Sequence, residues 1–188
     1  MQLAGRFLAV CWVIFIVVWL IAAWFTKRTV EHSGTRARWI VWIAAILLVG
    51  TRRWWLPFAS GVSLWHTTAS LAGVAAAVTA AGLVVALWAR AVLARNWSAA
   101  IVLKEHHELI DRGPYAFVRH PIYTGVLLMV LGTVTFSGTR AGVILFATMV
   151  AGLIVKARSE ERLLTKHFPE VYPLYRARVR SRLIPFVL

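Results

Sequence analysis

The 188-residue chain contains few of the residues that define most soluble enzyme classes. Its single cysteine, Cys11, cannot form an intramolecular disulfide. No Gly-x-Gly-x-x-Gly motif follows a predicted strand, so the signature of a dinucleotide-binding Rossmann sheet is missing. Acidic residues number only seven against 21 lysines and arginines, which gives a formal net charge of +14. These absences argue against a disulfide-stabilised fold and against a Rossmann enzyme.

Apolar residues are abundant instead, at 60% of the chain, and the mean hydropathy is +0.73. Residues 7–25, FLAVCWVIFIVVWLIAAWF, would form a helix about 28 Å long, enough to cross a bilayer. The run is too long for the core of a signal peptide, and the polar sequence TKRTVEH follows it in place of a cleavage site. No soluble basic module is present, so we expect no nucleic-acid partner despite the charge.

Four more apolar segments follow the first. The second begins at residues 39–50 and has an ill-defined end, the third is 70–89, and the fourth and fifth, 122–138 and 141–155, form a hairpin around SGTR. We therefore expect an all-α integral membrane protein of about five transmembrane helices. It would be a single membrane domain, in which residues 1–89 form the lipid or acceptor side and residues 90–188, with the hairpin 121–155, form the core.

The charged residues divide unequally between the two ends of such a bundle. With alternate loops on opposite sides, 17 of the 21 lysines and arginines fall on one side, in residues 27–38, 90–119 and 156–182. All seven acids fall there too. The positive-inside rule then predicts an external N-terminus and a cytoplasmic C-terminal segment. Polar chemistry should therefore reside at the cytoplasmic face, where basic loops also meet membrane lipids.

The motif RGPYAFVRHPIYTG, residues 112–125, lies where the fourth apolar segment begins. Pro121 suits the first position of a helix, and it pushes His120 out of the α region. Gly113-Pro114 predicts a second turn just upstream. Free N–H groups at the helix start would favour an anion. The motif thus predicts a rigid, aromatic-lined site at the membrane boundary, although Pro, Arg, His and Tyr are also common there for structural reasons.

An acidic pair, Glu160 and Glu161, follows the fifth apolar segment by about one turn. Carboxylates so close to hydrocarbon need partners. A purely structural interpretation supplies them at helical spacing, with Lys156 beside Glu160 and Arg158 beside Glu161. The functional alternative is that one carboxylate binds a cationic or hydroxyl-bearing ligand. Because the hairpin turn is short, we expect the acids to lie near the His120-Pro121 turn.

A ligand with charges of both signs would suit this combination. S-adenosylmethionine carries a carboxylate, an ammonium, a sulfonium and ribose hydroxyls. Helix N–H groups suit the carboxylate, a glutamate suits the ammonium or ribose, and a tyrosine ring can approach the sulfonium. Other dipolar ligands would satisfy the same set of residues.

The segments HHELIDRGPYAFVRHPIYTG, EERLLTKHF and YPLYRARV, in this order, resemble the isoprenylcysteine carboxyl methyltransferase family. They are also similar to the related membrane phospholipid methyltransferases. The likeness covers residues 96–186 and implies a membrane methyltransferase with S-adenosylmethionine as its donor. The chain departs from the family at Arg180-Ser181-Arg182, where a proline often stands, and this departure falls in the acceptor-recognition segment.

The resemblance also implies roles for individual residues. The donor pocket would be lined by Tyr115, Val118, Arg119, His120, Pro121 and Tyr123. The adenosine would lie near His107 and Leu109, and the ribose or amino-acid end near Glu160 or Glu161. The residue placed near the methyl-accepting group would be Arg178.

The acceptor stays open between chemical classes. A lipophilic small molecule or a prenylated acceptor would enter from the bilayer, and a carboxylate would need no general base. A thiol or an amine would need one, for which His120 and Glu161 are candidates. Adjacent His106 and His107 cannot share one ion from the same helical face, so no metal is expected. The alternatives are a phospholipid amine or thiol methyltransferase, an NADPH-dependent membrane reductase of the sterol type, and a non-catalytic membrane scaffold.

Overall fold

The structure, a computed structural model, describes residues 1–24, 62–93 and 109–184. These ranges are helical apart from short connections and one isolated β-bridge between Ser63 and Thr139. The elements are α1 (Gln2–Trp24), α4 (Ala69–Leu93), the 3₁₀ helix η2 (Gly113–Ala116), α5 (Pro121–Ser137), α6 (Arg140–His167) and α7 (Val171–Arg178). The predicted second span, residues 39–50 and beyond, lies outside the described residues.

Three of the helices, α1, α4 and α6, are long and apolar enough to cross a membrane. The 17-residue α5 is shorter, at about 25 Å, and packs between its neighbours. Large apolar side chains on α1 and α4 are exposed, including Val13, Leu20 and Val84. Such a surface suits lipid and would be unfavourable in water. The chain is therefore an integral membrane protein.

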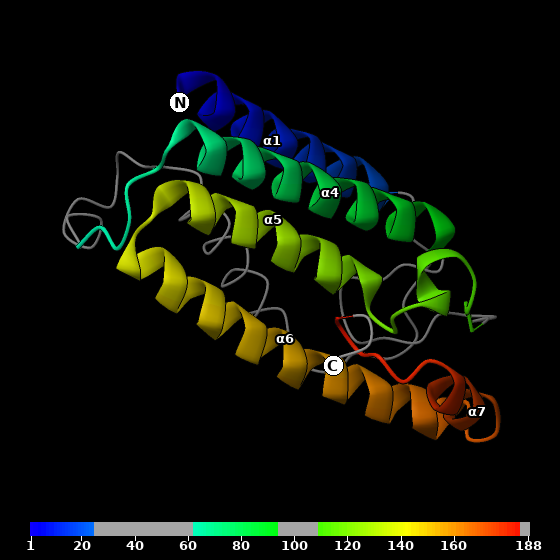
Figure 1. The fold of residues 1–188 in the computed structure, drawn as a ribbon. Coiled ribbons are helices and arrows are strands. Elements are labelled where there is room, and N and C mark those ends of the chain that lie inside the picture. The colour runs from blue at the N-terminus through cyan, green and yellow to red at the C-terminus, as the bar shows by residue number, and fades with distance from the viewer. Residues whose placement is uncertain (25–61, 94–108, 185–188) are drawn as a thin grey trace.

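The order of the helices brings the polar segments of the chain to one end of the bundle (Figure 1). Helices α1 and α4 run in the same direction, α5 runs back beside α4, and α6 returns from a tight turn. The end of α4, the start of α5, the end of α6 and all of α7 thus lie together at the right of Figure 1. This arrangement agrees with the segregation of charge predicted from the sequence.

Helices α4 and α6 are longer than the apolar runs that predicted them. Helix α4 extends beyond residue 89 to Leu93, so Arg90 belongs to its last turns, is buried, and donates to the carbonyl of Ala22 at 3.2 Å. Helix α6 extends beyond residue 155 to His167. The apolar pattern ends there, but residues 156–167 contain no proline or glycine, so nothing interrupts the helix. The polar end of α6 therefore projects as a continuous helix.

Small residues let α4 and α5 approach closely. A Cβ added at Gly125 would lie 2.6 Å from the carbonyl oxygen of Gly82, and one added at Gly82 would lie 2.5 Å from the carbonyl oxygen of Gly125. At Gly132 a Cβ would lie 2.2 Å from Oγ1 of Thr79. Close backbone approach through small residues is a common way for helices to associate in membranes. It also fixes where α5 begins.

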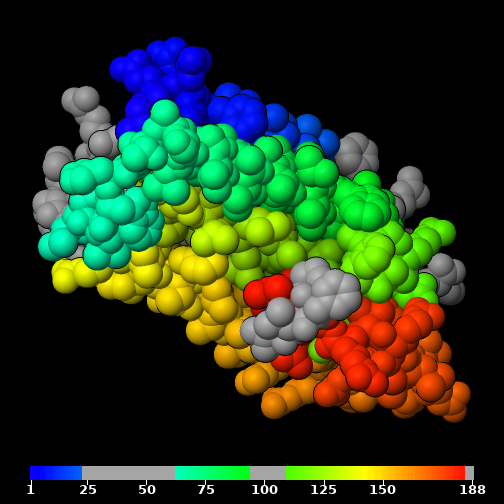
Figure 2. Space-filling view, in the orientation of Figure 1, coloured from blue at the N-terminus to red at the C-terminus, as the bar shows by residue number. Residues whose placement is uncertain are grey.

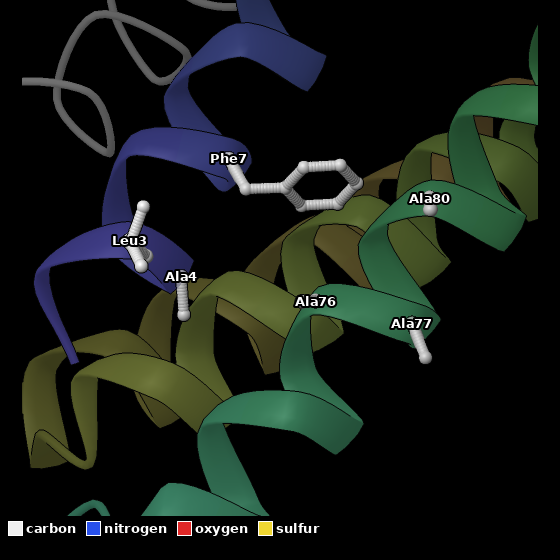
Figure 3. Close-up of a pocket in the computed structure, with 6 residues that line it drawn as sticks. All are labelled: Leu3, Ala4, Phe7, Ala76, Ala77 and Ala80. Atoms are coloured by element: carbon white, nitrogen blue, oxygen red, sulfur yellow. The ribbon is translucent and has the colours of Figure 1, made fainter.

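An apolar cavity of about 450 Å³ lies between the first turns of α1 and the N-terminal half of α4 (Figure 3). The residues that line it are Leu3, Ala4, Phe7, Ala76, Ala77 and Ala80. Figure 3 shows the Phe7 ring reaching from α1 toward α4. None of these side chains can bind a charged ligand or transfer a proton, and the cavity is far from the polar end of the bundle, so it has no part in the site described next.

Candidate functional site

The start of α5 has the local geometry that its sequence predicts. Pro121 is the first helical residue, and His120 precedes it at φ −126° and ψ 63°, outside the α region. Gly113 adopts a φ of +61°, which glycine tolerates, and opens the turn of η2. The N–H groups of Tyr123 and Thr124 both donate to the carbonyl of His120. Those two N–H groups are therefore used within the helix, and Pro121 has none to offer.

The acidic pair of α6 lies against this turn, as predicted. Glu161 accepts a hydrogen bond from Nε of Arg119 at 2.9 Å and lies 3.3 Å from Nε2 of His120. Arg182 binds the same carboxylate through two nitrogens, Nε to Oε1 at 2.9 Å and a terminal nitrogen to Oε2 at 3.0 Å. The cations on Glu161 are thus Arg119 and Arg182, not the Arg158 expected from helical spacing.

The second acid, Glu160, has different partners. Its Oε1 accepts from the hydroxyl of Tyr123 at 2.5 Å, and its Oε2 lies 3.4 Å from Nδ1 of His120. The His120 and Tyr123 rings stack at 5.4 Å between centroids. The ammonium of Lys156 lies 5.1 Å from the centroid of the Tyr123 ring. His120 therefore bridges two carboxylates, and Tyr123 links Glu160 to a nearby cation.

The C-terminal segment, residues 179–183, completes the cluster. In Figure 2 the red C-terminal part of the chain lies beside the yellow-green residues around η2 and the orange end of α6. The N–H groups of Arg119 and His120 donate to the carbonyls of Ser181 and Arg182, each at 3.0 Å. The guanidinium of Arg119 also donates to the carbonyls of Val179 and Arg180, both at 2.6 Å. These pairs are about 60 residues apart in the chain, and sequence patterns do not reveal them.

Helix α7 attaches to η2 through its tyrosines. The hydroxyl of Tyr175 donates to the carbonyl of Tyr115 at 2.8 Å, and both side chains are buried. Burial raises the pKa of Tyr115 and of Tyr175, so both hydroxyls stay protonated. Tyr172 is 1% exposed, and its hydroxyl finds no hydrogen-bond partner among the described residues. Leu109 packs against this aromatic group.

The predicted site residues separate into three groups. Those gathered around the acid pair are Arg119, His120, Pro121, Tyr123, Glu160 and Glu161. A second group lies on or near η2 and α7, next to the acid pair, and consists of Tyr115, Val118 and Leu109. His107 lies outside the described residues. Arg178 points elsewhere: it is 63% exposed and forms an ion pair with Asp111. Lys156 and Arg182, which the sequence did not assign to the site, belong to the cluster.

The electrostatic setting of His120 favours its charged form. Burial by itself lowers the pKa of this histidine, but the hydrogen bonds and negative charges of Glu160 and Glu161 outweigh burial, and the net pKa is raised. The groups that face the ring are these two acids and Tyr123, with Arg119 and Arg182 behind Glu161. The two carboxylates therefore favour the charged form of His120 between them.

This shift predicts a pH-dependent stability. Between the unfolded pKa of about 6.5 and the raised folded pKa, the folded protein holds a proton that the unfolded chain has lost, so stability should fall as pH rises through that interval. The measurement is the thermal unfolding midpoint in detergent from about pH 6 to about pH 9. His120→Gln should flatten the profile and His66→Gln, at an exposed position, should not. An unchanged profile in the first variant would refute this explanation.

Comparison with known proteins adds independent information. A family model described as phospholipid methyltransferase matches residues 61–171. Protein-S-isoprenylcysteine O-methyltransferase B of Arabidopsis thaliana is 35% identical over 85 residues, which are 45% of this chain and 43% of that protein. Cobalt-zinc-cadmium resistance protein CzcN of Cupriavidus metallidurans is 30% identical over 155 residues, covering 77% of this chain and 62% of that protein.

Among solved structures, the eukaryotic intramembrane Ras methyltransferase ICMT (isoprenylcysteine carboxyl methyltransferase) has a similar fold. Its TM-score is 0.59 at 20% sequence identity, over 84% of this chain and 55% of that one. The chain thus spans less than two thirds of the length of each of these three proteins. The family match includes α4, the η2 turn, the hairpin and both acids, but not Arg182 or the rest of the C-terminal segment that completes the cluster.

Proposed function

Because the chain belongs to the phospholipid methyltransferase family, we propose that it transfers a methyl group from S-adenosylmethionine to a lipophilic acceptor that enters from the bilayer. The observation that carries the proposal is the cluster at the start of α5, where His120 joins Glu160 and Glu161 at the polar end of the membrane helices. A polar cluster in this position can meet a water-soluble donor and a membrane-soluble acceptor together.

The two acids differ in their capacity to bind a donor. A carboxylate has about four acceptor positions. Arg119, His120 and Arg182 make four contacts with Glu161, three on Oε1 and one on Oε2, and its side chain is 6% exposed. Glu160 is 21% exposed, and its contacts with Tyr123 and His120 leave two positions. Glu160 is therefore the acid that we assign to the ammonium or ribose hydroxyls of the donor.

The other side chains near the acid pair have the chemical character that the methyl donor needs. When bound, S-adenosylmethionine supplies an electrophilic methyl group on a sulfonium. The aromatic faces of Tyr115 and Tyr123 are suited to a neighbouring cation, and Val118 and Leu109 offer apolar surface to an adenine ring. His107 keeps the adenosine role that the family resemblance implies. Arg119 does not line the pocket in this proposal, because its Nε binds Glu161 and one of its terminal nitrogens binds the C-terminal segment.

Lys156 is better placed than Arg178 to meet an anionic acceptor. It lies one turn before Glu160 on α6, toward the membrane-spanning part of the helix, with its ammonium over the Tyr123 ring. Arg178 is exposed and already paired with Asp111. An acceptor that moves along α6 from the bilayer would reach Lys156 first. We therefore assign the orienting cation to Lys156.

The contacts of His120 and Glu161 favour a carboxylate acceptor. An amine or a thiol must lose a proton before or during transfer, which needs a general base. A histidine whose charged form is favoured by two carboxylates is less available to accept a proton, and Glu161 is already bound by two arginines. A carboxylate needs no base: its oxygen forms the new bond to the methyl carbon as the bond from that carbon to sulfur breaks. The cluster then serves to orient both reactants and exclude water.

The polar end of the bundle would face the cytoplasm, where the donor is found. This orientation rests on the concentration of lysine and arginine at that end and agrees with five spans and an external N-terminus. The acceptor would approach laterally between helices, and the three N-terminal spans would contribute to its binding surface.

Glu160 and Lys156 variants test these assignments separately. Glu160→Gln should weaken binding of S-adenosylhomocysteine about tenfold to a hundredfold, because the ligand loses a negatively charged hydrogen-bond partner. Lys156→Gln should leave that binding within a few-fold but abolish methyl transfer from labelled S-adenosylmethionine to a membrane lipid extract. Arg158→Gln, on the exposed side of the same helix, is the matched control and should change neither.

The chemical class of the product tests the acceptor. A methyl ester releases its label as volatile methanol in mild alkali, whereas a methylated amine or thiol keeps it. Release of the label supports a carboxylate acceptor. Retained label would assign the chain to amine or thiol methylation, and no labelled product in any extract would contradict the proposed activity.

A further inference from the structure

The C-terminal segment, residues 179–183, acts on the acid cluster through one side chain. Its backbone pairs with the Arg119-His120 turn, and the hydroxyl of Thr124 donates to the carbonyl of Leu183. Leu183 is buried among residues of α1, α4, α5 and α6. These contacts hold Arg182 so that two nitrogens of its guanidinium bind the two oxygens of the Glu161 carboxylate.

Arg182 determines the orientation of the Glu161 carboxylate. Three donors converge on Oε1, from Arg119, His120 and Arg182. Within the described residues, Oε2 has a single donor, the terminal nitrogen of Arg182 at 3.0 Å. Two parallel bonds from a planar guanidinium fix both the position and the plane of a carboxylate. Without Arg182, the carboxylate could rotate about the bonds that remain.

The orientation of Glu161 is passed on to Glu160 through the histidine ring. Nε2 of His120 faces Oε1 of Glu161, and Nδ1 faces Oε2 of Glu160. Rotation of one carboxylate would therefore turn the ring and displace the other. Arg182 contacts neither Tyr123 nor Glu160 directly in the described cluster, so its influence on them must pass through Glu161 and His120.

We propose that Arg182 is a positioning residue for the donor site, one that holds Glu161 and His120 so that Glu160 presents its free oxygen positions to the donor. This inference rests on the proposed function. It also gives a role to the Arg180-Ser181-Arg182 sequence, which departs from the family pattern. Buried ion pairs add little net stability compared with apolar contacts, so the value of this pair lies in its geometry.

The neighbouring Arg180 provides a matched control. It carries the same side chain two residues away, but it is exposed and makes no ion pair with the described residues. Its carbonyl, which accepts from Arg119, is unchanged by a side-chain substitution. Arg180→Gln and Arg182→Gln thus remove equal charge from the same segment, and only the second removes the bonds to Glu161.

The experiment compares five variants with the wild-type chain in detergent. They are Arg180→Gln, Arg182→Gln, Arg182→Lys, Glu161→Gln and the double variant Glu161→Gln/Arg182→Gln. Calorimetry measures the affinity for S-adenosylhomocysteine, and hydrogen exchange reports on the amides of Arg119 and His120. Arg182→Gln should weaken affinity about tenfold to a hundredfold and speed exchange at both amides. Arg182→Lys should recover part of the affinity, because lysine keeps the charge but makes only one of the two bonds. The double variant should bind no more weakly than Glu161→Gln alone.

The outcomes separate this inference from the proposed function. If the wild type binds and Arg182→Gln binds equally well, the positioning role is wrong and the proposed function stands. Faster exchange with unchanged affinity also overturns the role, because Arg182 would then be only a structural link. Failure of the wild type to bind S-adenosylhomocysteine would overturn the proposed function, and the positioning role with it.

Discussion

Arg119→Gln is expected to abolish binding of S-adenosylhomocysteine and to lower the free energy of unfolding by about 3 kcal/mol. The side chain is buried, and it holds Glu161 and the carbonyls of Val179 and Arg180 at once. Removing it leaves a buried carboxylate with one cation fewer and two carbonyls without their donor. Both losses act at the point where the C-terminal segment meets α5.

The measurement is a denaturant titration in detergent together with calorimetry of the ligand. Arg112→Gln is the control, because Arg112 is an exposed arginine in the same connecting segment. Arg119→Lys should fall between the wild type and Arg119→Gln, since it keeps the charge without the branched geometry. Near wild-type stability and affinity in Arg119→Gln would show that the cluster does not depend on this residue.

Gly125→Val is the second substitution with a large expected effect. A Cβ at this position would lie 2.6 Å from the carbonyl oxygen of Gly82 and 2.7 Å from the backbone nitrogen of Ala86. Backbone atoms cannot move aside as flexible side chains do, so α4 and α5 would have to separate. We expect a loss of about 3 kcal/mol in the free energy of unfolding. Ligand affinity should also fall, because Gly125 lies within about one and a half turns of both His120 and Tyr123.

A glycine elsewhere on α4 provides the contrast. A Cβ at Gly73 would meet no atom within 4 Å, so Gly73→Ala should be neutral or stabilising by up to about 1 kcal/mol through helix propensity. The same titration measures both variants. Equal effects of the two substitutions would mean that close packing of α4 on α5 does not hold the start of α5 in place.

Local sequence rules predicted the elements of the site well. Pro121 begins a helix, His120 lies outside the α region, and a short turn folds α6 back against α5. Each of these features depends on a few adjacent residues. Because the turn is short, the same rules also placed Glu160 and Glu161 near His120, and the structure confirms that proximity.

Contacts between distant segments were not predictable in this way. Helical spacing offered Arg158 as the partner of Glu161, whereas Arg119 and Arg182 take that place from 42 and 21 residues away. An apolar count also ended α6 at residue 155, because hydropathy reports where lipid ends and not where a helix ends. The close approach of Gly82 and Gly125 depends on two helices meeting in register, which no single segment encodes.

The role of Arg178 near the methyl-accepting group rests on the family resemblance alone. The YPLYRARV segment matched the family, and α7 forms there with Tyr172 and Tyr175 buried as its anchor. The arginine at its end nevertheless pairs with Asp111 on an exposed surface. Lys156 lies beside Tyr123 at the site itself, on a stretch of helix that the apolar pattern had assigned to a loop.

Calorimetric titration of the detergent-purified wild-type chain with S-adenosylmethionine, with NADPH as the control ligand, is the decisive test of a donor site at His120. We expect saturable binding of S-adenosylmethionine and none of NADPH. Binding of NADPH instead would assign the chain to membrane reductases. Binding of neither ligand, in the presence of a membrane lipid extract as well as in its absence, would contradict a donor site at His120 and leave the acid cluster a structural element of a membrane scaffold.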